Sequence, residues 1–235
     1  GLGSDELLGG EGDDVIDGGS GGDTIIGGLG DDTVSGSGGV DLIEGGKGDD
    51  EIDGGEGNDQ VLGGEGADVI DGGAGGDTII GGLGDDMVAG SGGADFIEGG
   101  EGNDTIDGGS EGDTVTGGLG DDTITGGDGV DVAVFGGVQD DFTIAVAGDG
   151  TLTVTDKNTG TVLGVDTVSG VETLRFTDGD LTVATAENGD VTLTGADDVD
   201  DVVTIVGPGG AKLEGADGKD ALTGGSGNDV IAGGD

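Results

Sequence analysis

Apolar residues recur with a nine-residue period through the first half of the chain. Residues 9–134 divide into fourteen nonapeptides without insertion or deletion, beginning GGEGDDVID, GGSGGDTII and GGLGDDTVS. Position eight is apolar in every repeat, from Ile16 to Ala133. Positions seven to nine therefore predict a short strand whose middle side chain points inward. Positions one to six are rich in glycine and predict a turn.

Two strand–turn units make one coil of eighteen residues. Successive coils are expected to stack as two facing parallel sheets, with right-handed crossovers. The period thus predicts an all-β fold over residues 1–134, namely a right-handed parallel β-roll. This is a β-helix solenoid with two nonapeptides per coil. Residues 1–8 are interpreted as the end of a preceding repeat.

The charge of the chain points to cations as partners. It has 53 acidic and 5 basic residues and a formal charge of −48. Residues 1–134 hold 34 of the acids and one base, Lys47, which gives −33. Such a chain should repel nucleic acid and anionic membranes. It contains no run of about eighteen apolar residues, so we expect no membrane insertion.

The ligand chemistry is restricted to oxygen. There is no cysteine and no histidine, so thiolate and imidazole metal sites are excluded. Oxygen ligands favour hard cations such as calcium and magnesium. The missing histidine also removes the usual base of a catalytic triad. The adjacent carboxylates are better explained by cation binding than by glycoside hydrolysis, and we expect no enzymatic activity.

The roll predicted from the period needs bound cations to be stable. Two buried aliphatic side chains per coil offset little of the backbone entropy that folding costs, and the stacked carboxylates repel one another. A high charge with only four aromatic residues is otherwise typical of a disordered chain. Adjacent turns on one side of the roll can form a site from a carboxylate and glycine carbonyls. About twelve such gaps, each with one Ca²⁺, would offset about 24 negative charges.

The repeat resembles the RTX (repeat-in-toxin) nonapeptide of haemolysin-type calcium-binding proteins. The resemblance rests on glycine at positions one, two and four, aspartate at position six and the aliphatic residue at position eight. It covers residues 1–134 and, more weakly, 215–235. The resemblance implies that the position-six aspartates bind calcium together with loop carbonyls. It also implies export through type I secretion and folding in external calcium, and hence a secreted or cell-surface location.

The residues expected to bind metal are the position-six aspartates. They recur every nine residues through the array and reappear near the end of the chain, at Asp5, Asp14, Asp23, Asp32, Asp41, Asp50, Asp59, Asp68, Asp77, Asp86, Asp95, Asp104, Asp113, Asp122, Asp131, Asp220 and Asp229.

The period changes after residue 134. Strand-like stretches follow between residues 138 and 194, at 141–146, 151–156, 165–170, 171–176 and 180–185. Residues 135–206 resemble the β-rich segment that often follows RTX arrays. We expect it to cap the open end of the roll, with Leu174 and Phe176 in its core.

The nonapeptide pattern returns near the end of the chain. Residues 195–214 are interpreted as an acidic connector that contains Pro208. GADGKDALT and GGSGNDVIA then restart the repeat, and residues 207–235 are interpreted as the start of a second RTX array.

Three residues break the glycine pattern inside the array. Glu111 replaces glycine at position four, and strain near Asp113 is expected if that position has a positive φ. Ser37 and Ser91 replace glycine at position two and are expected to be milder changes.

The two outer faces of the roll also differ in sequence. Odd repeats place acids on theirs, whereas even repeats place apolar residues at positions seven and nine, for example Leu42 and Phe96. This difference suggests that the even-repeat face binds another β domain or a second copy of the chain.

Two functions fit these observations. The first is a calcium-binding structural module of a secreted or surface protein, such as an adhesin, surface layer or extracellular filament. The alternative is the non-catalytic RTX module of a secreted enzyme such as a protease or a mannuronan epimerase. A polysaccharide-binding surface is less favoured because the aromatic platform it usually needs is missing.

Overall fold

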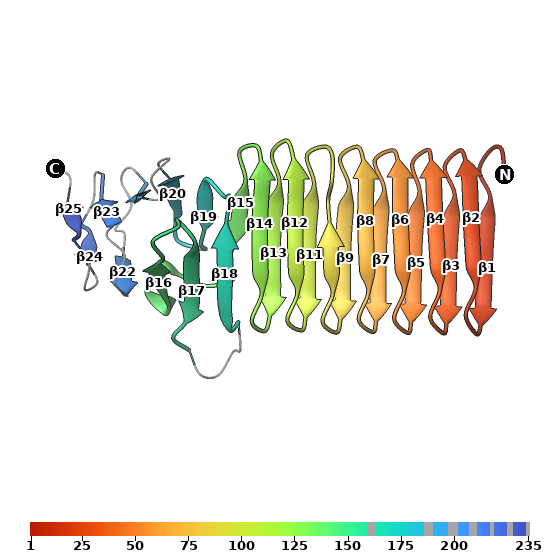
Figure 1. Ribbon diagram of the computed structural model, residues 1–235, viewed down its shortest axis with the longest axis horizontal. Helices are drawn as coiled ribbons and strands as arrows, with labels where there is room; N and C mark the ends of the chain where they lie inside the picture. The colour runs from red at the N-terminus through yellow and green to blue at the C-terminus, as the bar shows by residue number, and fades with distance from the viewer. Residues whose placement is uncertain are drawn as a thin grey trace.

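Each repeat contributes one β-strand, and successive strands alternate between two sheets. A computed structural model of the chain describes residues 1–158, 163–185, 190–196, 202–206, 211–216, 219–224 and 228–233. The strands of the roll stack side by side along its long axis, with the N-terminus at one end (Figure 1). They are β1 (Glu6–Glu11), β2 (Val15–Ser20), β3 (Thr24–Leu29), β4 (Thr33–Gly38), β5 (Leu42–Lys47), β6 (Glu51–Glu56), β7 (Gln60–Glu65), β8 (Val69–Ala74), β9 (Thr78–Leu83), β10 (Met87–Ala89), β11 (Phe96–Glu101), β12 (Thr105–Ser110), β13 (Thr114–Leu119), β14 (Thr123–Asp128) and β15 (Val132–Val134).

Within the roll, from β1 to β15, the odd-numbered strands form one parallel sheet and the even-numbered strands form the other. Residues paired across neighbouring strands are eighteen positions apart, as in Leu7 with Ile25 and Ile25 with Ile43. This register confirms the predicted coil of two nonapeptides and the parallel β-roll.

Most strands are longer than the sequence predicts. They contain positions seven to nine of one repeat and positions one to three of the next, so the turn has only three residues. The predicted six-residue turn was therefore wrong. Glycine is typical of turns, but here paired glycines such as Gly10 and Gly28 remain in the hydrogen-bonded ladder.

The core of the roll is a double column of aliphatic side chains. Every position-eight residue from Ile25 to Ala133 is at most 3% exposed. Side chains from the two sheets meet between them, and each coil therefore adds only two residues to the core. The same columns continue beyond the array with Val168 and Leu174, both fully buried.

The β-rich segment after the array extends both sheets. Its elements are η1 (Gln139–Asp141), β16 (Phe142–Val146), β17 (Leu152–Asp156), β18 (Val165–Ser169), β19 (Thr173–Arg175), β20 (Asp180–Thr185), β21 (Val191–Thr194), β22 (Val202–Val206), β23 (Ala211–Glu214), β24 (Ala221–Thr223) and β25 (Val230–Ala232). All five predicted strands up to residue 185 are confirmed.

Two strands of this segment join the roll directly. β18 pairs in parallel with β14, and β19 pairs in parallel with β15. β16 and β17 then add to β18 as antiparallel strands, while β20 and β21 add to β19. We call residues 135–158 and 163–185 the cap. Figure 1 shows it covering the end of the roll that β14 and β15 form.

Three of the four phenylalanines gather in the cap. The rings of Phe135, Phe142 and Phe176 lie with centroids 5.3–5.6 Å apart, and each side chain is at most 5% exposed. Phe176 and Leu174 are core residues, as predicted. The cluster supplies apolar contacts where the regular columns end.

Parallel pairing returns near the C-terminus. β21 pairs with β23, and β23 pairs with β25 at a spacing of eighteen residues, as in Leu213 with Ile231. The expected connector over residues 195–214 therefore contains two strands, β22 and β23. Pro208 lies outside the described residues.

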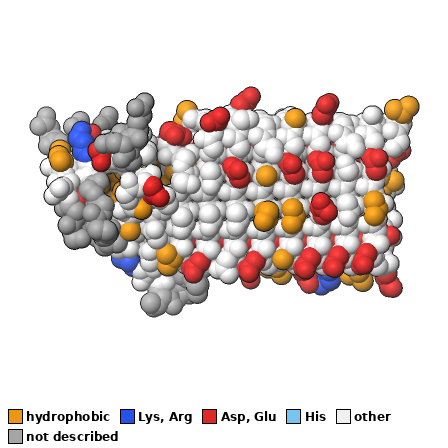
Figure 2. Space-filling model, viewed as in Figure 1, with side chains coloured by type: hydrophobic (Ala, Val, Ile, Leu, Met, Phe, Trp, Pro, Cys, Tyr) orange, Lys and Arg blue, Asp and Glu red, His pale blue; other side chains and the backbone are white. Residues whose placement is uncertain are grey.

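The outer faces of the two sheets are less different than the sequence suggests. Leu42 and Phe96 are exposed on the even-repeat face, but Val69 and Met87 are exposed on the other face. Figure 2 shows acidic side chains in rows along the roll, with apolar ones scattered among them on the face in view. Among the described residues, no helix is long and apolar enough to cross a membrane.

Candidate metal sites along the turns

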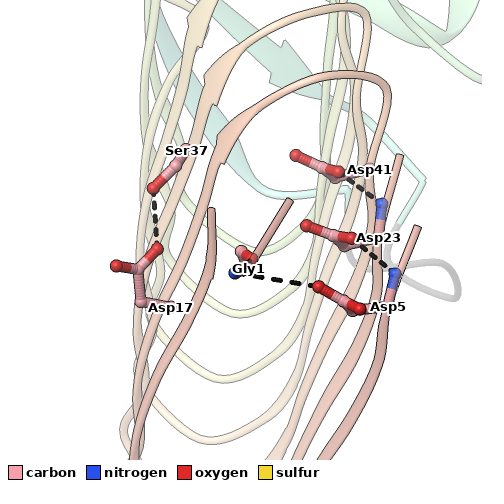
Figure 3. Close-up of polar contacts among 7 residues, drawn as sticks. Gly1, Asp5, Asp17, Asp23, Ser37 and Asp41 are labelled. Atoms are coloured by element: carbon pink, nitrogen blue, oxygen red, sulfur yellow. Dashed lines mark hydrogen bonds and ion pairs between the residues drawn. The ribbon is translucent and has the colours of Figure 1, made fainter. Parts of the chain in front are cut away.

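The position-six aspartates form two columns, one along each edge of the roll. The even-repeat column starts at Asp5 and continues with Asp23 and Asp41; the backbone amide of Asp23 donates to Oδ1 of Asp41 at 2.7 Å (Figure 3). The odd-repeat column contains Asp14 and its successors and has the same bonds. From Asp23 to Asp131, each carboxylate thus accepts a hydrogen bond from a backbone amide of the preceding coil, so that a carboxylate recurs every eighteen residues in each column.

The second oxygen of these carboxylates makes no hydrogen bond. In all fourteen repeats Oδ2 of the position-six aspartate is buried and has no hydrogen-bond partner. From Asp23 to Asp131 these residues are at most 3% exposed. A buried, unpaired carboxylate oxygen is costly unless a cation lies against it. The arrangement therefore fits a positively charged ligand in every turn.

Glycine at position one leaves room for that oxygen. A Cβ built on Gly81 would lie 2.5 Å from Oδ2 of Asp86 and 2.6 Å from the carbonyl oxygen of Gly99, one coil further on. A carboxylate and a carbonyl oxygen therefore converge beside the same glycine. Any side chain at this position would displace one of them.

Carbonyl oxygens also lie against the position-four glycines of the next coil. Gly48, with a φ of +123°, lies against the carbonyl oxygen of Gly30 in the preceding coil. Glycine allows the close approach and adopts the positive φ without strain. Among the described residues, no three acidic side chains converge enough to hold a metal by themselves. A site here would combine carboxylate and carbonyl oxygens, a ligand set that suits calcium.

Burial raises the pKa of the position-six aspartates from Asp41 to Asp122. Burial and, to a smaller extent, the neighbouring carboxylates raise the pKa of Asp86 to about 7 and that of Asp104 to about 6. In the other column the pKa values of Asp59 and Asp95 are raised to about 6 for the same two reasons. The hydrogen bond from the backbone opposes the shift without cancelling it. A divalent cation would remove this electrostatic cost.

The two edges of the roll are not equivalent. Along the odd-repeat edge, position five also carries oxygen-bearing side chains in most turns, as in Asp31, which accepts a hydrogen bond from the amide of Asp49 at 2.9 Å. The equivalent positions of the even-repeat edge are glycine, alanine or valine, apart from Asn58. Within the fourteen repeats, the odd-repeat edge therefore carries twelve aspartates at positions five and six, against seven on the even-repeat edge.

The repeat matches a known protein family. The family model "RTX calcium-binding nonapeptide repeat (4 copies)" matches in overlapping copies across residues 1–143 and again at 207–235. The chain belongs to the RTX calcium-binding repeat family. RTX repeats bind calcium and are typical of secreted bacterial proteins. A search of curated proteins found no match.

The predicted RTX aspartates lie where the sequence placed them. Those from Asp5 to Asp131 occupy the two columns, one in each turn. Asp229 accepts a hydrogen bond from the amide of Ala211 at 3.1 Å, in the same eighteen-residue relation. Asp220 lies against Gly215 in the way that a position-six aspartate lies against its position-one glycine.

The residues that depart from the RTX pattern keep its backbone. Glu111 has a φ of +80°, so this glutamate adopts the left-handed conformation that glycine supplies elsewhere. Ser37 and Ser91 also have positive φ, at +73° and +71°. The hydroxyl group of Ser37 donates to Asp17 at 2.9 Å (Figure 3). That of Ser91 donates to Asp71 at 2.7 Å, and both bonds offset part of the backbone strain.

Two members of the columns were missed in the sequence. The amide of Asp122 donates to Asp166 at 3.1 Å, and the amide of Asp131 donates to Glu172 at 2.9 Å. Both carboxylates lie in the cap, outside the regular period. The signal was present in the short stretches DTV and ETL, which repeat the acid–threonine–aliphatic order of positions six to eight.

Proposed function

We propose that this chain is a calcium-dependent structural module of a secreted or cell-surface protein. In this proposal, calcium ions bind between adjacent turns of each edge, about one for each gap, and the position-six aspartates are their carboxylate ligands. The main support is the buried, unpartnered Oδ2 in all fourteen repeats. Among the described residues, no group donates a hydrogen bond to these oxygens to offset the cost of burying them.

The proposed role of the ions is to make the roll stable. The two sheets share only a narrow aliphatic core, and carboxylates such as that of Asp86 have raised pKa values because they are buried and, to a smaller extent, because their charges are close together. Calcium would neutralise those charges and connect successive coils, so that binding free energy becomes folding free energy. Such a module would remain unfolded during type I secretion and fold in calcium outside the cell.

Within this role we favour an adhesin, a surface layer or an extracellular filament. The long repetitive array supports a spacer or scaffold, and histidine is absent from the sequence. The alternative is a non-catalytic module attached to a secreted enzyme such as a protease or an epimerase. The sequence of the intact gene separates the two, since a catalytic domain in the same polypeptide would favour the second.

Calcium binding is tested by isothermal titration calorimetry of the full chain. We expect about twelve or more ions per chain with dissociation constants of about 10⁻⁴–10⁻³ M, the range of extracellular modules. Magnesium at the same concentration is the matched control, because it prefers a smaller octahedral site and retains its water. Binding of only one or two ions, or equal binding of both metals, would reject the proposal.

A further inference from the structure

The two aspartate columns continue past the last repeat. Asp122 and Asp131 end the odd-repeat and even-repeat columns of the array, and their amides donate to Asp166 and Glu172 of the cap. These are the bonds that every earlier coil makes to the next position-six aspartate. Asp166 is 4% exposed, which is close to the burial of the array aspartates.

Carbonyl oxygens of the cap also occupy the positions that carbonyl oxygens of the next repeat occupy within the array. A Cβ on Gly108 would meet Oδ2 of Asp113 and the carbonyl of Gly126, each at 2.5 Å. At Gly126 the equivalent neighbours are Oδ2 of Asp131, at 2.8 Å, and the carbonyl of Gly170. The cap therefore presents a carbonyl where a further repeat would place one.

The odd-repeat edge shows the same replacement. Gly164, with a φ of +79°, lies against the carbonyl oxygen of Gly120, as position-four glycines do within the array. The amide of Val165 donates to Asp121 at 2.8 Å, which continues the position-five bonds of this edge. Both edges of the cap thus reproduce the polar surface of an RTX coil without its sequence.

Unpartnered oxygens at this junction point to a ligand. Oδ2 of Asp122 and Oδ2 of Asp131 are buried without a hydrogen-bond partner, and the two side chains are 1% and 0% exposed. Oδ2 of Asp156, at the end of β17, is also buried and has no hydrogen-bond partner. The negative charges of Asp121, Asp122 and Asp156 all act on Asp166.

We propose that calcium also binds at the junction between the roll and the cap, with Asp166 and Glu172 as the terminal carboxylate ligands of the two columns. Neither residue lies within the segments that match the RTX family. Ions at these places would attach β18 and β19 to the last coil, so that the cap folds only when the array is loaded. This inference rests on the proposed calcium-binding function of the array.

The test uses isosteric amides in the full chain. Asp166→Asn and Glu172→Gln keep the acceptor oxygen for the amides of Asp122 and Asp131 but lose the charge of the ligand. The control is Asp140→Asn, which removes a carboxylate that is 74% exposed and forms an ion pair with Lys157. Calcium stoichiometry and hydrogen exchange of cap peptides are measured across a calcium titration.

We expect the double variant to bind about two ions fewer than the unaltered chain. The calcium concentration that protects residues 142–156 and 165–175 should rise about tenfold or more, while strands β3 to β9 keep their protection. The control should match the unaltered chain. Glu172→Asp, which introduces the residue used by the array, should retain the calcium-dependent protection of the cap.

Three outcomes separate the possibilities. Unchanged stoichiometry and an unchanged midpoint in the double variant would overturn the junction sites while leaving calcium binding by the array intact. A cap that stays protected in the amide variants would assign Asp166 and Glu172 a purely hydrogen-bonding role. Failure of the unaltered chain to bind calcium would instead reject the proposed function itself.

Discussion

The backbone amide of Asp86 donates a hydrogen bond of 2.9 Å to Oδ1 of Asp104, one coil further along the roll. Oδ2 of Asp104 remains buried with no hydrogen-bond partner. One oxygen therefore sets the register between coils, and the other is available to a cation. This division of roles recurs along both edges of the roll.

Replacing one position-six aspartate should weaken calcium binding in its own turn. Asp86→Asn keeps an acceptor for the amide of Asp68 but puts a neutral amide in place of the carboxylate. We expect the calcium midpoint of folding to rise several-fold and the calcium-loaded roll to lose about 1–3 kcal/mol. The matched control is Asp107→Asn, because Asp107 is exposed on the outer face. Equal effects of both variants would contradict a ligand role for Asp86.

A methyl group on the glycine at position one should disturb the candidate calcium site at Asp86. The Cβ of Gly81→Ala would lie 2.5 Å from Oδ2 of Asp86 and must displace it or the carbonyl of Gly99. We expect a loss of about 1–3 kcal/mol and weaker calcium binding, measured by thermal unfolding at fixed calcium. Gly38→Ala is the control, because its Cβ would meet nothing within 4 Å. A stable Gly81→Ala with normal affinity would argue against the site.

Glu111 is expected to be a point of stored backbone strain. Its φ of +80° is unfavourable for a residue with a side chain, so Glu111→Gly should stabilise the roll by about 1 kcal/mol. Glu101→Gly is the control, because Glu101 lies in strand β11 and has no positive φ. This control should be destabilised by about 0.5–1 kcal/mol. Chemical denaturation in the presence of calcium measures the free energy of unfolding of both variants and shows whether each is stabilised or destabilised.

The pH dependence should have opposite signs with and without calcium. Burial raises the pKa of Asp86 from its ordinary value of 3.8 to about 7, so the folded chain binds protons more tightly than the unfolded chain. The stability of the metal-free roll should therefore increase as pH falls from about 7 towards 4. Calcium requires the ionised carboxylate, so its affinity should fall over the same window. Calcium titrations at pH 7.5 and 5.5, followed by circular dichroism, check both signs.

The sequence predicted the roll because its period is strict. Aspartate at position six and an aliphatic residue at position eight, as in Asp23 and Ile25, specify one turn and one inward side chain in every repeat. Strand length was not predictable from residue type, because glycine favours turns in general but pairs across coils here. Ser37 and Ser91 could not be assigned their hydrogen bonds, since Asp17 and Asp71 lie in the neighbouring coil.

The repeat pattern did not predict the two carboxylates at the junction with the cap. Asp166 and Glu172 continue the columns, but 44 and 41 residues separate them from Asp122 and Asp131 instead of eighteen. An inserted hairpin, β16 and β17, accounts for most of the added length before β18. Only the pairing of β18 with β14 brings Asp166 beside Asp122, and that pairing depends on tertiary structure.

The most direct test of the whole account is far-ultraviolet circular dichroism of the full chain during a calcium titration that starts in chelator. We expect a largely disordered spectrum without calcium and a cooperative change to β-structure at about 10⁻⁴–10⁻³ M calcium, reversed when chelator is added back. A β-rich spectrum of equal intensity in chelator, at neutral pH, would contradict the claim that bound calcium holds the coils together.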